Sequence, residues 1–205
     1  MHPSAAFRPK LPAAGERALC EALIDEIGFG MVFAATPDGP RVAHTPLLST
    51  GDGALQFHLS RGNALTRHLD GATALAVVNG PDGYVSPRWY EGDQQVPTWN
   101  YVALELEGRV RRMDQDGLLG CLEMLAVRHE AQVLEGTSWT MDRLSADRRR
   151  ELLSGIVGFE MEVQAWRPTL KLSQNKPEAE RGRVIEGLER QGSRAIAELM
   201  RTLGA

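Results

Sequence analysis

The chain has 205 residues, 42% of them hydrophobic, and its 23 basic and 27 acidic residues give a formal net charge of −4 at pH 7. This length predicts one domain, or one domain with a helical extension, and the apolar fraction is sufficient for an ordinary globular core. A net negative charge argues against a protein whose main task is to grip duplex DNA by charge. The one cationic run, Arg148, Arg149 and Arg150, is more typical of a solvated helix face.

The cysteine content and the N-terminal segment indicate a protein of a reducing compartment. Cys20 and Cys121 both fall on the apolar stripe of an expected helix, so we predict buried, reduced thiols. Residues 1–11 lack the apolar core of a signal peptide, and no apolar run approaches the roughly 20 residues that span a bilayer. We therefore expect a cytoplasmic protein without a membrane partner. No cysteine has a partner at metal-ligand spacing, and His129–Glu130 lacks a third ligand, so no metal site is expected.

Hydrophobic periodicity predicts the elements of the first half of the chain. Apolar residues at four-residue spacing indicate a helix over 16–27, which Gly28 ends. Turn residues and alternation then predict, in order, strands over 29–35, 41–48 and 54–60, a short helix over 64–69, and a strand over 73–78. The run Asn79-Gly80-Pro81-Asp82-Gly83 is expected to end that last strand in a turn.

The second half begins with an irregular segment over 84–90 and continues with longer elements. We expect a strand over 99–112, a helix over 117–130, a helix over 143–153 capped by Ser145, a strand over 156–167, and weak helices over 184–190 and 194–203. About six strands in meander-like order, joined by hairpin turns, predict antiparallel pairing and closure into a barrel. The predicted class is mainly β with peripheral helices. Residues 1–175 would form the barrel with inserted helices, and 176–205 a helical extension of the same domain.

Polar side chains cluster at the ends of three expected strands. The densest cluster is Lys171-Leu172-Ser173-Gln174-Asn175-Lys176-Pro177; the other two are Val96-Pro97-Thr98-Trp99-Asn100-Tyr101 and His58-Leu59-Ser60-Arg61-Gly62-Asn63. A surface turn needs Gly, Asn, Asp or Pro, but it does not need several side chains that can all donate to one acceptor-rich ligand. The three clusters therefore predict an anionic, partly aromatic ligand.

These three clusters, together with the segment Gly80-Pro81-Asp82-Gly83-Tyr84-Val85-Ser86-Pro87-Arg88-Trp89-Tyr90, resemble the PaiB family, which is grouped as FMN-binding negative transcriptional regulators. The resemblance extends from Phe7 to about Gly187. It departs from the family at Gly62-Asn63-Ala64, where relatives often have Ala-Asn-Pro, and at Asp82-Gly83, where a His-Ala type pair is common. The resemblance implies the FMN-binding split β-barrel of pyridoxamine-phosphate-oxidase-like proteins, a homodimer with flavin at the subunit interface, and a role in transcriptional regulation.

With FMN as the expected cofactor, Arg61 is the first choice for the phosphate, because its guanidinium donates in a fork. Ser60, Asn63 and the backbone N–H groups of the expected helix start would complete an anion cradle. The competing interpretation is structural: Arg61 caps a turn and Asn63 is the N-cap of the helix.

The other two clusters can donate to the phosphate, the ribityl chain or the ring carbonyls. The donors assigned to this role are Lys171, Ser173, Gln174 and Asn175, with Thr98 and Asn100 beside them. A helix-capping turn would explain Ser173 and Asn175 but not Lys171 and Gln174. Trp99 shares a strand face with Tyr101 and either lies near the flavin ring or belongs to the core.

His44 and His58 lie on expected barrel strands, where histidines are more often structural than catalytic, and both can donate to flavin oxygens. No catalytic residue is predicted. Three functions remain open: a flavin-dependent regulator, a flavin-dependent oxidoreductase acting on a small molecule, and a haem-handling split barrel. No helix-turn-helix pattern is evident, so FMN binding ranks ahead of DNA binding, which is expected to be weak.

Overall fold

The computed structural model describes residues 4–203. The helices are η1 (Ala5–Phe7), α1 (Ala13–Ile27), η2 (Pro87–Trp89), α2 (Gln115–Glu130), η3 (Met141–Arg143), α3 (Ala146–Ser154), α4 (Glu178–Arg190) and α5 (Arg194–Thr202), where η marks a 3₁₀ helix. The strands are β1 (Phe29–Thr36), β2 (Gly39–Pro46), β3 (Leu48–Ser49), β4 (Ala54–Ser60), β5 (Thr73–Val85), β6 (Thr98–Arg112) and β7 (Ile156–Lys171). None of the described helices is long and apolar enough to cross a membrane.

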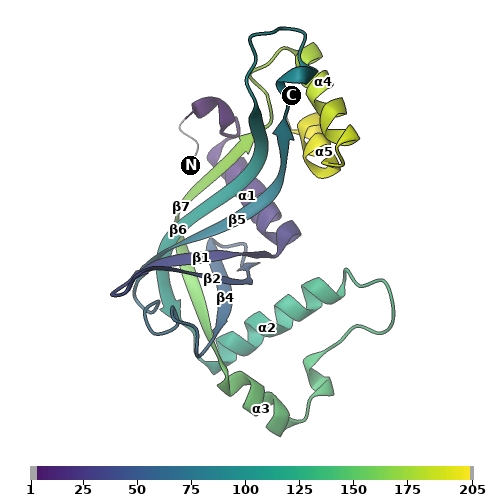
Figure 1. Cartoon of the computed structure of the whole chain (residues 1–205). Coiled ribbons are helices and arrows are strands. Elements are labelled where there is room, and N and C mark those ends of the chain that lie inside the picture. Colours follow the sequence, from purple (N-terminus) through teal and green to yellow (C-terminus); the bar gives the residue numbers. More distant parts are fainter. Residues whose placement is uncertain (1–3, 204–205) are drawn as a thin grey trace. The chain divides into compact units, whose positions relative to one another are not determined.

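The strands form one antiparallel sheet in the order β2-β1-β5-β6-β7-β4-β3, with helices at its periphery (Figure 1). By its internal contacts the chain divides into two compact units. Unit 1 comprises residues 1–20, 79–105 and 167–205, and unit 2 comprises residues 21–78 and 106–166. The predicted class, mainly β with peripheral helices, is confirmed.

Within unit 2 the sheet curls back on itself. β2 and β4 are far apart in the strand order, yet the Thr45 hydroxyl of β2 donates to the carbonyl of His58 on β4 at 2.7 Å. Thr45 is buried, with 1% of its surface exposed. This side-chain contact brings the two ends of the sheet together in the manner of a barrel, although no backbone ladder joins β2 to β4 in the described part of the chain.

Strict alternation along β4, and the inward apolar residues Val157, Phe159 and Met161 of β7, build the core of unit 2. Each strand turns large apolar residues inward, and Phe57 and Phe159 stack with their ring centroids 5.6 Å apart. Gly108 allows β6 to approach β7 closely, because a Cβ there would lie 2.0 Å from the Glu162 carbonyl oxygen. Cys20 and Cys121 are buried and neither forms a disulfide, and burial raises the pKa of the Cys121 thiol to about 11.

The prediction that the strand over 73–78 ends in a turn at residue 79 was wrong, because β5 continues to Val85. The pairing of β5 with β1 runs from Leu75 to Val77, so the later residues have a free edge on that side. Pro81 lacks a backbone donor, and such an edge tolerates it. Gly80 allows close contact with β6, since a Cβ there would lie 2.9 Å from Val102.

The short helix predicted over 64–69 was also wrong, since these residues form consecutive turns. The backbone bonds Thr66 N–H to Asn63 and His68 N–H to Leu65 each span three residues and do not propagate. The Thr66 hydroxyl donates to the Ser60 carbonyl at 2.8 Å, a local alternative to helix formation. The other predicted helices are confirmed, and Ser145 caps α3 by accepting from Arg148 N–H at 3.3 Å.

In unit 1, α4 and α5 pack side by side and α4 also contacts η2 (Figure 1). Two glycines make these contacts possible. A Cβ on Gly83 would lie 2.6 Å from Leu188 of α4, and a Cβ on Gly187 would lie 2.3 Å from the Trp89 ring of η2. The absence of a side chain at these positions brings the end of β5 and helix η2 against the C-terminal helices.

We predict that Gly187→Ala destabilises the protein by about 1–3 kcal/mol, because the added methyl group has no space beside Trp89. Gly182→Ala is the matched control on the same helix: a Cβ there meets no atom within 4 Å, and alanine gains about 1 kcal/mol of helix propensity. Urea unfolding of both variants measures the difference. Equal stability of the two variants would contradict the close approach of α4 to η2.

Candidate functional site

The first polar cluster lies in unit 2, where a cavity of about 390 Å³ collects three arginines. Its lining comes from the turn after β4, the end of β6, the start of α2, the end of α3 and the start of β7; the residues are Arg61, Arg112, Met113, Asp114, Gln115, Leu118, Arg150, Leu153, Ser154, Ile156, Val157 and Gly158. We call it the arginine cavity. Asp114 is the one acidic residue of this lining, and its carboxylate accepts from Gly117 N–H at 2.8 Å as the N-cap of α2.

Arg61 performs the structural role that the sequence left open. Its Nε donates to the Ser154 carbonyl at 2.8 Å and its Nη2 to the Ile156 carbonyl at 3.5 Å, so it closes the C-terminal end of α3. The Asn63 side chain accepts from Leu65 N–H at 2.9 Å, and Ser60 Oγ accepts from Gly62 N–H at 3.3 Å. Since no helix begins here, the predicted helix-start cradle is absent from this described turn.

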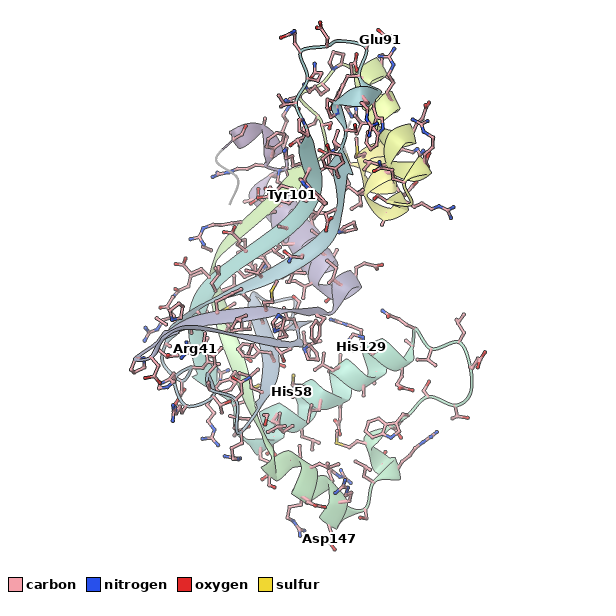
Figure 2. The ribbon with its side chains drawn as sticks, viewed as in Figure 1. Arg41, His58, Glu91, Tyr101, His129 and Asp147 are labelled. Carbon is pink, nitrogen blue, oxygen red and sulfur yellow. The ribbon has the colours of Figure 1, made fainter. Side chains whose placement is uncertain are left out.

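The two candidate histidines differ in their environment. His44 is exposed on β2. His58 is half-buried on β4 (Figure 2), on the same strand face as Ser60. Burial lowers the pKa of His58, which favours the neutral ring, and its buried Nδ1 has no hydrogen-bond partner among the described residues.

The second polar cluster lies in unit 1, around a pocket of about 280 Å³. Segments from four parts of the sequence line it: Phe7, Tyr90, Gln95, Val96, Thr98, Asn100, Lys171, Ser173, Asn175 and Lys176. We call it the lysine pocket. The structure thus brings together five of the predicted residues, namely Thr98, Asn100, Lys171, Ser173 and Asn175.

A buried polar pair forms the floor of the lysine pocket. Asn100 Nδ2 donates to Ser173 Oγ at 2.9 Å, and both residues are almost fully buried. Ser173 has a φ of +58°, the one positive φ of a non-glycine residue in the described chain, and such a conformation costs energy that its contacts must offset. Ser173 also hydrogen-bonds Tyr90. The pKa of Tyr90 is raised overall, mainly by burial and also by the charge of Glu180, although the bond to Ser173 acts to lower it.

Each lysine of the lysine pocket has a neutral hydrogen-bond partner and an aromatic neighbour. Lys171 Nζ donates to Thr98 Oγ1 at 2.5 Å and lies 5.7 Å from the Phe7 ring centroid. Lys176 Nζ donates to Gln95 Oε1 at 2.7 Å and lies 5.3 Å from the Tyr90 ring centroid. Desolvation lowers the pKa of Lys171.

Two predicted residues of the clusters that form the lysine pocket, Trp99 and Gln174, lie outside it. Trp99 is 54% exposed and meets Tyr84 edge-on with the ring centroids 5.9 Å apart, so it is not a core residue. Strand alternation places it on the opposite face of β6 from Thr98 and Asn100, together with Tyr101. The Gln174 side chain folds back to its own segment: Nε2 donates to the Leu170 carbonyl at 2.6 Å and Oε1 accepts from Leu172 N–H at 2.7 Å.

The sequence prediction omitted several residues of these two sites. Arg112 and Arg150 line the arginine cavity, and Phe7, Tyr90 and Lys176 line the lysine pocket. Lys176 stands in the predicted motif and was omitted although its residue type suits an anion. Tyr90 stands in the segment that resembles the family and Arg150 in the cationic run, but neither was assigned to a ligand; Arg112 and Phe7 reach their pockets only through the fold. The prediction that the three polar clusters contact one flavin stays a prediction.

Comparison with known proteins defines the class. A family model described as "Putative FMN-binding domain" matches residues 6–165. Among solved structures, the FAD and Heme binding protein from Mycobacterium smegmatis has a TM-score of 0.59 at 20% identity and covers 80% of this chain and 76% of that one. The conserved hypothetical protein Rv2991 from Mycobacterium tuberculosis has a TM-score of 0.55 at 12% identity, with 83% and 92% covered. The curled antiparallel sheet and the family match together define a flavin-binding split-barrel protein.

Sequence relatives identify the family. "Protease synthase and sporulation protein PAI 2" of Bacillus subtilis (strain 168) is 31% identical over 184 residues, which cover 86% of this chain and 87% of the relative. "Uncharacterized protein AN0679" of Emericella nidulans is 27% identical over 201 residues, which cover 80% of each. The chain belongs to the PaiB family of FMN-binding-domain proteins, which confirms the resemblance found in its motifs.

We predict that Ser173→Ala destabilises the protein by about 1–3 kcal/mol, because the buried Asn100 amide loses its hydroxyl partner. Ser173→Gly removes the same hydroxyl but relieves the positive φ, so it should be the less destabilised of the two. Chemical denaturation measures both changes. A glycine variant less stable than the alanine variant would show that Ser173 is not strained.

Proposed function

We propose that this flavin-binding protein takes FMN specifically and that the arginine cavity holds the FMN phosphate. The observation that carries the proposal is the donor set: three guanidinium groups and one aspartate line one cavity. That aspartate already accepts a backbone N–H at the start of α2. Three guanidinium groups against one carboxylate leave the cavity lining with a net positive charge. That charge favours a dianion such as a phosphate monoester, which pairs well with forked guanidinium donors.

Arg61 can serve the fold and the ligand together. A guanidinium carries five N–H donors, and the two carbonyl bonds of Arg61 use two of them. Those bonds fix the direction of the group, which lowers the entropic cost of binding a phosphate. Arg112 and Arg150 add positive charge from β6 and α3, although Arg150 also pairs with Asp147 at 3.0 Å.

The chemistry of such a site belongs to the cofactor, since a bound flavin supplies electron transfer that no protein side chain provides. The protein's share is to hold and orient it. His58 supports a ligand near β4, because a buried ring nitrogen without a protein partner is unfavourable unless something else satisfies it.

The PaiB family also implies transcriptional regulation, and we propose that any such role does not depend on direct charge-driven DNA contact. On exposed helix α3, Arg148 pairs with Glu151 at 2.6 Å and Arg150 with Asp147 at 3.0 Å. Two of the three arginines of this run therefore have an acidic partner on their own helix. Since nonspecific DNA affinity follows the number of phosphates neutralised, flavin binding ranks ahead of DNA binding.

We predict that Arg61→Ala weakens FMN binding by about 10- to 100-fold and leaves riboflavin binding nearly unchanged, because only FMN carries the phosphate. Fluorescence titration of flavin-stripped protein measures both affinities. Arg67→Ala is the matched control, since Arg67 is an exposed arginine of the same turn that does not line the cavity. Thermal unfolding of each variant separates ligand loss from loss of the α3 contact.

Equal losses for FMN and riboflavin would show that Arg61 acts through the fold and not through the phosphate. The absorption spectrum of the purified protein, followed by release of the chromophore, tests the cofactor itself. A haem spectrum would overturn the assignment of FMN.

The flavin is proposed to lie at a homodimer interface, with the exposed aromatic pair Tyr84 and Trp99 as part of that interface. These residues are 39% and 54% exposed, and paired exposed aromatics are typical of surfaces that bind a partner.

We predict a dimer in sedimentation at micromolar concentration and a shift toward monomer in Trp99→Lys. The control Val133→Lys, an exposed apolar residue of unit 2, should remain dimeric. A stable wild-type monomer would remove the shared site.

A further inference from the structure

The lysine pocket concentrates a residue type that this chain otherwise almost lacks. Of its 23 basic residues three are lysines, Lys10, Lys171 and Lys176. Two of the three line one pocket of about 280 Å³ in unit 1. The rest of the basic residues are arginines, so the grouping of two ammonium ions in one place requires an explanation.

The two ammonium groups face a pocket lining that contains no carboxylate. The described lining residues are neutral apart from the lysines themselves. The hydrogen-bond partners of the lysines are a hydroxyl and an amide oxygen, on Thr98 and Gln95. The charge of Glu180 raises the pKa of Tyr90, but Glu180 pairs with Arg183 at 3.0 Å and does not line the pocket.

The surroundings hold the cations in place without neutralising them. Contacts of Lys171 with Phe7 and of Lys176 with Tyr90 restrain the flexible side chains. Desolvation disfavours the charged form of Lys171, which lowers its pKa. An anion in the pocket would offset that cost, because an opposite charge nearby favours the protonated amine.

Neutral donors and apolar surface complete the pocket. Ser173 is held in a strained backbone conformation that places its hydroxyl beside Asn100 and Tyr90. Val96, which is 73% exposed, adds an aliphatic group to the aromatic surface of Phe7 and Tyr90. A ligand with one charged end and an apolar body matches this division.

We propose that the lysine pocket is a binding site for a small carboxylate with an apolar body, separate from the site of the flavin phosphate. The pocket is slightly smaller than the roughly 300–1,000 Å³ of sites that enclose drug-sized ligands, so it suits a small acid better than a whole flavin nucleotide. Lysines act as point charges without the guanidinium fork, whereas three guanidinium groups line the arginine cavity. The inference therefore goes beyond FMN binding and does not depend on Arg61.

Benzoate is the test probe, with benzamide as its uncharged counterpart and inorganic phosphate as the competing anion. Reductive ¹³C-methylation keeps the lysine charge and gives each of the three lysines an NMR signal. Benzoate should shift the signals of Lys171 and Lys176 saturably, in protein with and without FMN, and should leave the signal of Lys10 in place. Calorimetry on unmodified protein should show benzamide binding at least about tenfold weaker than benzoate.

Lys171→Met should weaken benzoate about tenfold or more, and Lys10→Met, the matched control, should not. Several results would overturn the proposal: no saturable shift, equal binding of benzamide, or phosphate binding at lower concentration than benzoate. FMN that shifts the Lys171 signal and displaces benzoate would also overturn it, because the pocket would then belong to the flavin site. The FMN and riboflavin titrations of Arg61→Ala report separately on the phosphate site.

Discussion

The hydrogen bond from Thr45 to the His58 carbonyl joins β2, at one end of the sheet order, to β4, which lies next to the other end, and the curl of unit 2 depends on that contact. If β2 stayed an open edge, its backbone groups would face water and invite pairing with another chain. With the sheet curled, β4 pairs with β7 along its full length. Its last residues then stand beside the start of β7 and the end of α3, where Arg61 bonds two carbonyls and the arginine cavity forms.

Unit 1 depends on close backbone approach instead. Gly80 brings β5 against β6, Gly83 brings the end of β5 against the C-terminal helices, and Gly187 brings α4 against Trp89. These contacts hold the segment that carries Tyr90, which hydrogen-bonds Ser173. A pocket with two lysines, a strained serine and a buried amide therefore rests on positions where any side chain would collide.

Most secondary structure could be predicted because alternation and helical spacing are local. The core strand β4 and the capped helix α3 agree with their predicted limits to within a few residues. The two failures have one cause, since turn-forming residues were interpreted without their neighbours. Pro81 lies in an edge strand because β1 ends its pairing before that point, and Thr66 bonds the Ser60 carbonyl instead of continuing a helix.

The sequence by itself determined the family, the fold class and the residue types suited to an anionic cofactor, because motifs and periodicity are properties of contiguous residues. The tertiary structure alone decided which donors share a space. It separated Arg61 from Lys171 into different units, turned Trp99 away from Thr98, folded Gln174 back onto the end of β7 and brought Phe7 to the lysine pocket. Pockets are formed by segments distant in the chain, and their meeting depends on strand pairing and close packing that no local pattern records.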